Sequence, residues 1–273
     1  MRFVSLAVSR KTKRRVKLLL VLCAVLGGFL FAAEGRYAIF RLQNIELISP
    51  GLISEKALWA VIKPEEAVFW PLFLGRSNSC ATALESYYPA DVKISLRGWG
   101  KFRLEAKPLA PAFKMIWDDK YWYVAADGRA WLATLPGNKY IATGDCDSRP
   151  LLTWGKTRTT PIDFAASRGN IHISSLPVPR IMGWYKNIDA IGWRSYVRGM
   201  QAGEREGMPV VRLVFDDGLG GPGANILFVD DPKQWYEAEL AVMKLFPVMG
   251  KIPPKVFIDT TYKGKILVKN IVK

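Results

Sequence analysis

The sequence predicts a membrane-anchored α+β fold. It starts with a single N-terminal transmembrane helix, continues with a small α+β unit, and ends in a mainly antiparallel β domain with a late helix. Three observations lead to this prediction: an uncharged apolar run behind a basic tail, a strand–helix–helix–strand–strand order after it, and short alternating strands in the remainder. Half of the 273 residues are hydrophobic, so the chain can bury a substantial core.

The N-terminal tail, residues 1–17, carries seven of the basic residues and no acidic residue. The run Leu18–Ala33 behind it has no charged side chain, and we predict a transmembrane helix over residues 18–38. A cleaved signal peptide is the alternative, but the run ends in a poor cleavage site and the basic stretch is long for a signal peptide. Since Lys and Arg are retained inside, we expect a cytoplasmic N-terminus, a single pass through the membrane, and the bulk of the chain outside the cytoplasm.

Two further expectations depend on this placement. The net charge of +15 would suit nucleic acid, but seven charges lie in the tail and the rest of the chain is expected to be exported, which argues against a nucleic-acid partner. Ala24, Gly28 and Ala32 recur every four residues, a small-residue stripe that permits close helix packing in a membrane. Whether Cys80 and Cys146 form a disulfide stays open.

The first exported unit is expected over residues 39–108. Alternating side chains predict a strand before the Pro50-Gly51 turn, and Ser54 is a suitable N-cap for the helix that follows. Ser79 is an N-cap candidate for a second helix, which ends at Pro89. The alternating segments DVKISLRG and KFRLEAKP then predict two strands joined by a glycine-containing turn.

The second exported unit is expected over residues 109–273 and is mainly β. The segments AFKMIWDD, YWYVAADG and RAWLA predict strands, whereas Pro136–Arg180 has weak periodicity and predicts irregular structure with strands at LLTW and IHIS. A hairpin is expected after Pro209, and a helix with Asp231 as its N-cap. The segment KVFIDTTYKGKILVKNIVK predicts closing β structure with a turn or bulge at Lys263-Gly264.

The candidate chemical motifs favour ordinary structural roles. Residues 218–223 fit the pattern GxGxxG, but they lead into a strand, so no helix N-terminus faces a phosphate and no cofactor is expected. His172 is the single histidine, so a Ser/His/Asp triad would have to use it and a metal site with several histidine ligands is impossible. The acidic pairs lie at turns or helix caps. We therefore expect no enzyme; an anchored cell-wall hydrolase would need a pocket around His172.

Three segments carry a resemblance to a known family. The junction YYPADVKISLRGWGKFRLEAKPLAPAFKMI, the segment YWYVAADGRAW and the closing FIDTTYKGKILVK stand in the order found in the FtsQ/DivIB family of cell-division proteins. In this comparison residues 39–108 resemble a POTRA domain, and residues 109–273 resemble the β domain of that family.

The resemblance implies a protein of the bacterial inner membrane with a periplasmic bulk, which acts as a non-enzymatic scaffold of the divisome at the septum. Such a scaffold binds bitopic proteins of the FtsB and FtsL type, and other divisome components, and links division to septal peptidoglycan synthesis. The alternative is a POTRA-containing component of outer-membrane or secretion assembly. That reading would need a membrane barrel or further POTRA units.

The partner site is expected on the closing strands, because an edge strand offers unpaired backbone groups to an added strand. In this hypothesis Tyr262 is an aromatic anchor, Ile266 an apolar contact, and Lys263 and Lys265 attract an acidic partner segment. An ordinary solvated terminal hairpin is the alternative. The complete set of candidate partner-binding residues is Asp259, Tyr262, Lys263, Gly264, Lys265 and Ile266.

Overall fold

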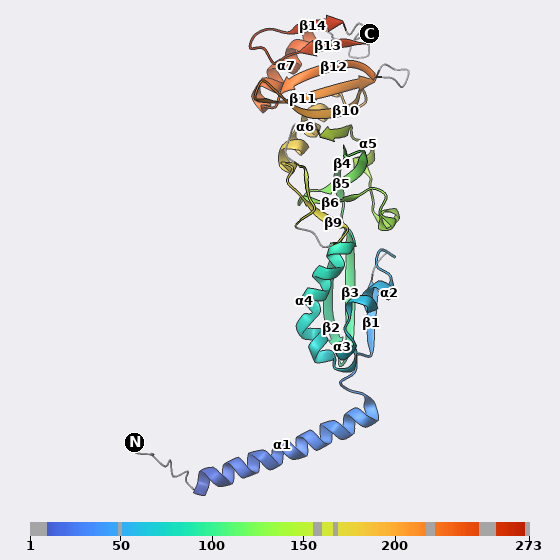
Figure 1. The fold of residues 1–273 in the computed structure, drawn as a ribbon, viewed down its shortest axis with the longest axis vertical. Helices are drawn as coiled ribbons and strands as arrows, with labels where there is room; N and C mark the ends of the chain where they lie inside the picture. The colour runs from blue at the N-terminus through green and yellow to red at the C-terminus, as the bar shows by residue number, and fades with distance from the viewer. Residues whose placement is uncertain are drawn as a thin grey trace, which may run out of the picture. The chain divides into compact units, whose positions relative to one another are not determined.

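The computed structural model describes residues 10–48, 51–154, 160–165, 169–216, 222–245 and 255–270. The chain divides into two compact units, whose elements are labelled in Figure 1. The first unit consists of residues 1–49, 54–81 and 93–105, and the second of residues 50–53, 82–92 and 106–273.

The N-terminal helix corrects the sequence-based prediction of a transmembrane segment. Helix α1 runs from Arg10 to Tyr37, but no helix in the described ranges is both long enough and apolar enough to cross a membrane, so the prediction of a spanning helix over residues 18–38 is wrong. The uninterrupted apolar run Leu18–Ala33 rises only about 24 Å, whereas a hydrocarbon core is about 30 Å thick.

The prediction that the small residues of α1 pack against another helix in a membrane also loses its support. Ala24, Gly28 and Ala32 lie at successive turns of α1. A Cβ atom added at Gly28 would meet no atom of the described residues within 4 Å. The packing stripe was inferred for a helix inside a bilayer, and that setting is not supported.

The first unit is built on a three-stranded sheet, as far as the structure describes it, in the order β1-β3-β2 with β1 and β3 parallel. The turn between β2 and β3 requires glycine at position 100, where φ is +63° and an added Cβ would lie 2.3 Å from the carbonyl oxygen of Arg41. The element bounds are β1 Asn44–Ile48, α2 Glu55–Val61, α3 Pro64–Val68, α4 Trp70–Tyr87, β2 Ala90–Gly98 and β3 Lys101–Pro108.

Helix α4 lies alongside this sheet (Figure 1). The ring of Phe73 meets the ring of Phe102 from β3 edge-to-face, with 4.7 Å between the centroids, and both side chains are buried. The predicted cap is confirmed, since the Ser54 hydroxyl accepts from the Ala57 N–H at 3.2 Å. The predicted start of the second long helix at Ser79 is wrong, because α4 begins at Trp70 and Ser79 lies inside it.

The second unit contains a mixed sheet of eleven strands within the described residues. Its order is β14-β13-β12-β11-β10-β7-β4-β5-β6-β9-β8, and most neighbours are antiparallel, while β7 pairs in parallel with β4 and β10, and β12 with β13. The strands are β4 Pro111–Trp117, β5 Lys120–Ala125, β6 Arg129–Leu132, β7 Leu151–Trp154, β8 Ile162–Asp163, β9 Ile171–Ser174, β10 Val197–Arg205, β11 Met208–Asp216, β12 Pro222–Val229, β13 Val256–Asp259 and β14 Leu267–Asn270.

One face of this sheet carries the main core of the unit. Helix α6 (Val178–Ala190) buries Ile181, Trp184 and Ile188, and helix α7 (Pro232–Leu245) buries Trp235 and Val242. The indole of Trp235 stacks on Phe228 of β12, with interplanar angle 7° and centroids 4.9 Å apart. The remaining short elements are η1 (Pro136–Tyr140) and α5 (Asp145–Ser148).

The opposite face of the sheet, here called the open face, is hollowed over its C-terminal strands. Side chains alternate between faces along a strand, so the neighbours of Ile226, Phe228 and Ile258 point away from α6 and α7. The register places one transverse row on that face: Gln201 pairs with Arg212, Arg212 with Leu227, Leu227 with Asp259, and Asp259 with Leu267. This open face and the β14 edge frame the predicted partner site.

Candidate functional site

The predicted site lies at the end of the sheet, on the hairpin formed by β13 and β14. These strands are antiparallel, with Val256 opposite Asn270 and Asp259 opposite Leu267. In the described part of the chain β14 pairs only with β13, and its four residues are exposed. A row of backbone N–H and C=O groups therefore faces outward at this edge.

Asp259 ends β13 and is a buried anchor, with its side chain only 4% exposed. Its carboxylate accepts hydrogen bonds from the Thr261 N–H at 3.0 Å, from the Thr261 hydroxyl at 2.7 Å, and from the Arg205 guanidinium. Burial alone would raise the pKa of Asp259, but these hydrogen bonds and the charge of Arg205 outweigh it and hold that pKa below its ordinary value. The carboxylate fixes the backbone where the chain leaves β13.

Tyr262 is held over the surface by the same arginine. The Nη2 atom of Arg205 donates to the Tyr262 hydroxyl at 2.7 Å, and the guanidinium carbon lies 5.1 Å from the centre of the Tyr262 ring. The tyrosine remains 42% exposed. One guanidinium thus bridges a buried carboxylate and an exposed ring, which limits the freedom of Tyr262 before any partner arrives.

The turn predicted at Lys263-Gly264 is present. The Lys265 N–H donates to the Tyr262 carbonyl at 3.2 Å, and Gly264 has φ +70°, as position three of a type II turn requires. Lys263 and Lys265 are exposed on either side of the glycine. Ile266 is different: it is partly buried and packs against the core of the second unit, so it is not available as a free contact.

A hollow of about 490 Å³ lies beside the hairpin on the open face of the sheet. It is lined by residues of β10, β11, β12 and β13 and by Lys269 of β14. The guanidinium of Arg212 lies 5.6 Å from the Phe257 ring within it. Three cations, Arg205, Arg212 and Lys269, face two carboxylates there, and one of these, Asp259, is already paired with Arg205. The hollow is therefore suited to an acidic segment with an apolar side chain.

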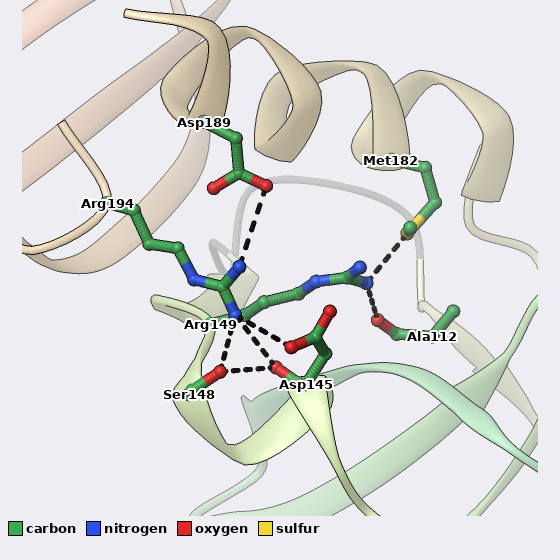
Figure 2. A network of polar contacts seen from close by, with 7 residues as sticks. All are labelled: Ala112, Asp145, Ser148, Arg149, Met182, Asp189 and Arg194. Carbon is green, nitrogen blue, oxygen red and sulfur yellow. Dashed lines mark hydrogen bonds and ion pairs between the residues drawn. The ribbon is translucent and has the colours of Figure 1, made fainter. Parts of the chain in front are cut away.

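A second polar cluster joins α5 to α6 and β4 (Figure 2). Arg194 contacts the Asp145 carboxylate at 3.4 Å and the Ser148 hydroxyl, and lies 3.9 Å from the Asp189 carboxylate. Arg149 donates to the Ala112 carbonyl and lies against the Tyr185 ring at 5.6 Å. No nucleophile with an adjacent base is among these side chains, so we assign the cluster a structural role.

The side chains considered for catalysis do not assemble into a site. The His172 ring contacts the rings of Trp122 and Phe164, with centroids 5.6 and 4.8 Å away, and burial lowers the pKa of His172. Neither the hollow on the open face nor a hollow of about 430 Å³ between α3 and α4 includes His172. No group of three or more His, Cys, Asp or Glu side chains suited to a metal ion occurs among the described residues. Most of the loop 218–223 lies outside those residues.

Arg205 is the residue of this candidate site that sequence reasoning missed. It lies on β10, far in sequence from Asp259 and Tyr262, and its neighbours Glu204 and Glu206 suggest only a solvated charged turn. No local pattern in the sequence indicates the contact. Arg205 lies on β10 and Asp259 on β13, and β11 and β12 stand between these strands in the sheet.

Comparison with other proteins adds nothing to this assignment: no family model matches the sequence, and no curated protein matches it. The geometry of the hairpin and the hollow is therefore the basis on which a function can be proposed.

Proposed function

We propose that this chain is a non-enzymatic scaffold of the bacterial divisome that acts at the septum. Its partners are bitopic division proteins of the FtsB and FtsL type, and their capture links division to septal peptidoglycan synthesis. The observation that carries the proposal is the exposed edge of β14 beside a hollow lined by Arg205, Arg212 and Lys269. The family resemblance of the closing motif supports the same reading.

Strand addition alone would bind weakly at this edge. The four residues of β14 extend about 13 Å, and a partner strand of that length forms roughly four backbone hydrogen bonds. At about 1 kcal/mol each these contribute about 4 kcal/mol, whereas micromolar affinity needs about 8 kcal/mol. The remainder has to come from side chains, which the hollow, Tyr262 and Leu267 can contact on the open face.

The charge of the site selects the kind of segment. Arg212 and Lys269 line the hollow, and Lys263 and Lys265 are exposed in the turn between β13 and β14. Complementary charges mainly raise the rate of encounter and exclude wrong partners. The partner segment is therefore acidic, with a short extended stretch that pairs with β14.

The test measures affinity of the full chain for the extracytoplasmic segments of small bitopic coiled-coil proteins from the same cell. Tyr262→Ala should weaken binding by about tenfold or more, as expected for a central aromatic anchor, whereas Tyr262→Phe keeps the ring and should retain most of the affinity. The double variant Lys263→Glu, Lys265→Glu should weaken binding about as much.

Lys233→Glu is the matched control for charge. Lys233 is exposed at the start of α7, the helix that covers the other face of the sheet. Reversal of the charge at Lys233 should leave the affinity for the partner segments unchanged. Absence of binding by the wild-type chain would overturn the scaffold proposal, and equal loss in the Lys233 variant would refute the location of the site.

A further inference from the structure

One end of the first unit exposes several large apolar side chains. We call this group the aromatic end. Trp99, in the turn between β2 and β3, is 65% exposed, and Val68, at the end of α3, is 63% exposed. The members of the aromatic end are the exposed Val68, Phe69, Leu72 and Trp99, and the partly buried Phe40 and Trp70, which contact Phe69 and Trp99.

Backbone hydrogen bonds hold the aromatic end together. The Trp70 N–H donates to the Phe40 carbonyl at 2.8 Å, and the Trp70 indole donates to the Ile39 carbonyl at 3.0 Å. The Gln43 N–H donates to the Gly100 carbonyl at 2.8 Å, which joins the segment to the β2–β3 turn. The segment after α1 is thereby fixed between the α3–α4 junction and that turn.

The rings are also ordered by contact with one another. Phe40 and Phe69 have centroids 5.6 Å apart, and Trp70 meets Trp99 edge-to-face at 6.2 Å. Trp70 in turn touches Phe102, which belongs to the buried core of the unit. The exposed rings therefore stand on a rigid base and do not belong to a loose loop.

Packing within the unit does not explain this exposure. Phe73 and Phe102 already fill the interface between α4 and the sheet. A turn between two strands ordinarily carries small or polar residues, yet Trp99 stands there between two glycines. A cluster of exposed aromatic and aliphatic side chains in a folded unit marks an interaction surface.

The charges beside the aromatic end are mainly positive. Arg41 follows Phe40, Lys101 follows the turn that holds Trp99, and Lys63 precedes α3, and all three side chains are exposed. Glu65 is the exposed acid of α3, whereas Glu66 is buried and paired with Arg76. The surface thus combines exposed rings with a basic rim.

We propose that the aromatic end docks on the surface of a bilayer that contains anionic lipid. Trp99, Phe69 and Val68 enter the boundary between headgroups and acyl chains, where amphipathic aromatic rings are favoured. The cations of the rim contact lipid phosphates, and each such residue near the surface adds to the attraction. Only surface contact is required, and no helix has to cross the bilayer.

The test places a local probe at the docking surface, because bulk binding to vesicles would also report on the exposed apolar side chains of α1. In the full chain with Cys23→Ser, the remaining thiols, Cys80 and Cys146, are buried. Trp99→Cys is labelled with a fluorophore that responds to polarity. Vesicles contain phosphatidylcholine with or without phosphatidylglycerol, and some carry a nitroxide quencher on the acyl chain.

Ser79→Cys supplies the control position. Ser79 is exposed on α4, and nine residues past Trp70 it lies about 13 Å further along the helix axis. With anionic vesicles the label at position 99 should shift its emission to shorter wavelength and lose intensity to the acyl-chain quencher, while the label at position 79 does neither. Lys63→Glu with Lys101→Glu should reduce the effect at position 99.

Three results would overturn the inference. The label at position 99 could show the same emission with vesicles as in buffer, or the labels at positions 99 and 79 could show equal shifts and equal quenching. The label at 99 could also respond only to an added division partner, which would assign the surface to a protein. Val68→Cys provides a second label position, so that loss of the Trp99–Trp70 contact does not decide the outcome.

Discussion

Asp259 shows how one buried side chain prepares the closing hairpin. Its carboxylate accepts from Thr261 and from Arg205, and the pKa of Asp259 is lowered in the folded chain. Asp259→Asn should lower the free energy of unfolding at pH 7 by about 2 kcal/mol, because it removes charge-assisted hydrogen bonds while keeping the shape of the side chain. Chemical denaturation measures the difference.

The same residue makes a signed prediction about pH. Because the pKa of Asp259 is lower in the folded chain than in the unfolded chain, the ionised carboxylate stabilises the fold fully above its unfolded pKa, near 3.8. This stabilisation is lost as the pH falls through the folded pKa. The difference in free energy of unfolding between wild type and Asp259→Asn should therefore be constant from pH 5 to 7 and should shrink below about pH 3.8. Asp119→Asn, in an exposed turn, is the control; a gap that persists in strong acid would contradict the assignment.

Glu239 makes the opposite prediction. This carboxyl is 3% exposed on α7, its hydrogen-bond donor is the Trp235 indole, and burial raises its pKa to about 7 from 4.5. Because the folded state holds the proton more tightly than the unfolded chain does, wild-type stability should fall as pH rises from about 4.5 to 7.

Glu239→Gln should remove this dependence and become the more stable protein above pH 7. The gain is at most about 3 kcal/mol, since each pKa unit corresponds to about 1.4 kcal/mol. Urea denaturation at several pH values compares the two chains. Stability curves that run parallel for both would show that Glu239 does not titrate in this range.

At the scale of elements, the β13–β14 turn sets the register of the edge strand. Gly264 has φ +70°, and a Cβ added there would meet no atom within 4 Å in the described part of the chain, so a substitution would affect the backbone and not the packing. Gly264→Ala should cost about 1 kcal/mol, and Gly264→Asn less, because Asn tolerates the left-handed region better. Denaturation of both variants tests this; equal costs would contradict the turn geometry.

The sequence predicted some elements well and others poorly. The strands at LLTW and IHIS and the late helix after Asp231 are confirmed. Helix α6 was missed, although Val178, Ile181, Trp184 and Ile188 follow helical spacing, because prolines and glycines around them suggested irregular structure. A proline fits the first turn of a helix, so these signals were compatible with α6.

The site was only partly predictable for a related reason. Turn chemistry is local, so Lys263-Gly264 could be placed from the residues alone. The contacts of Arg205 with Asp259 and Tyr262, and the packing of Ile266 against the core, depend on strand order across the whole sheet. A single sequence shows which residues can pair, but not which distant strands become neighbours.

At the scale of the whole molecule, the two proposed surfaces lie in different units. The partner site belongs to the second unit and the aromatic end to the first. Binding at one surface affects the other only if a ligand distinguishes two states of the chain. Variants at Tyr262 and at Trp99 therefore probe separate properties, and failure of one proposal leaves the other standing.

Net charge leads to a last prediction about the complete chain. Seven of the fifteen excess positive charges lie in residues 1–17, which leaves +8 for the remainder, including Lys263 and Lys265. Exposed charges act over about 10 Å at 0.1 M salt, so the association rate with an acidic partner should fall steeply as salt rises while the dissociation rate changes little. Surface plasmon resonance measures both. Lys263→Glu with Lys265→Glu should flatten the salt dependence of association, and Lys233→Glu should not; a salt effect confined to dissociation would place these lysines in buried contacts and refute their role in steering.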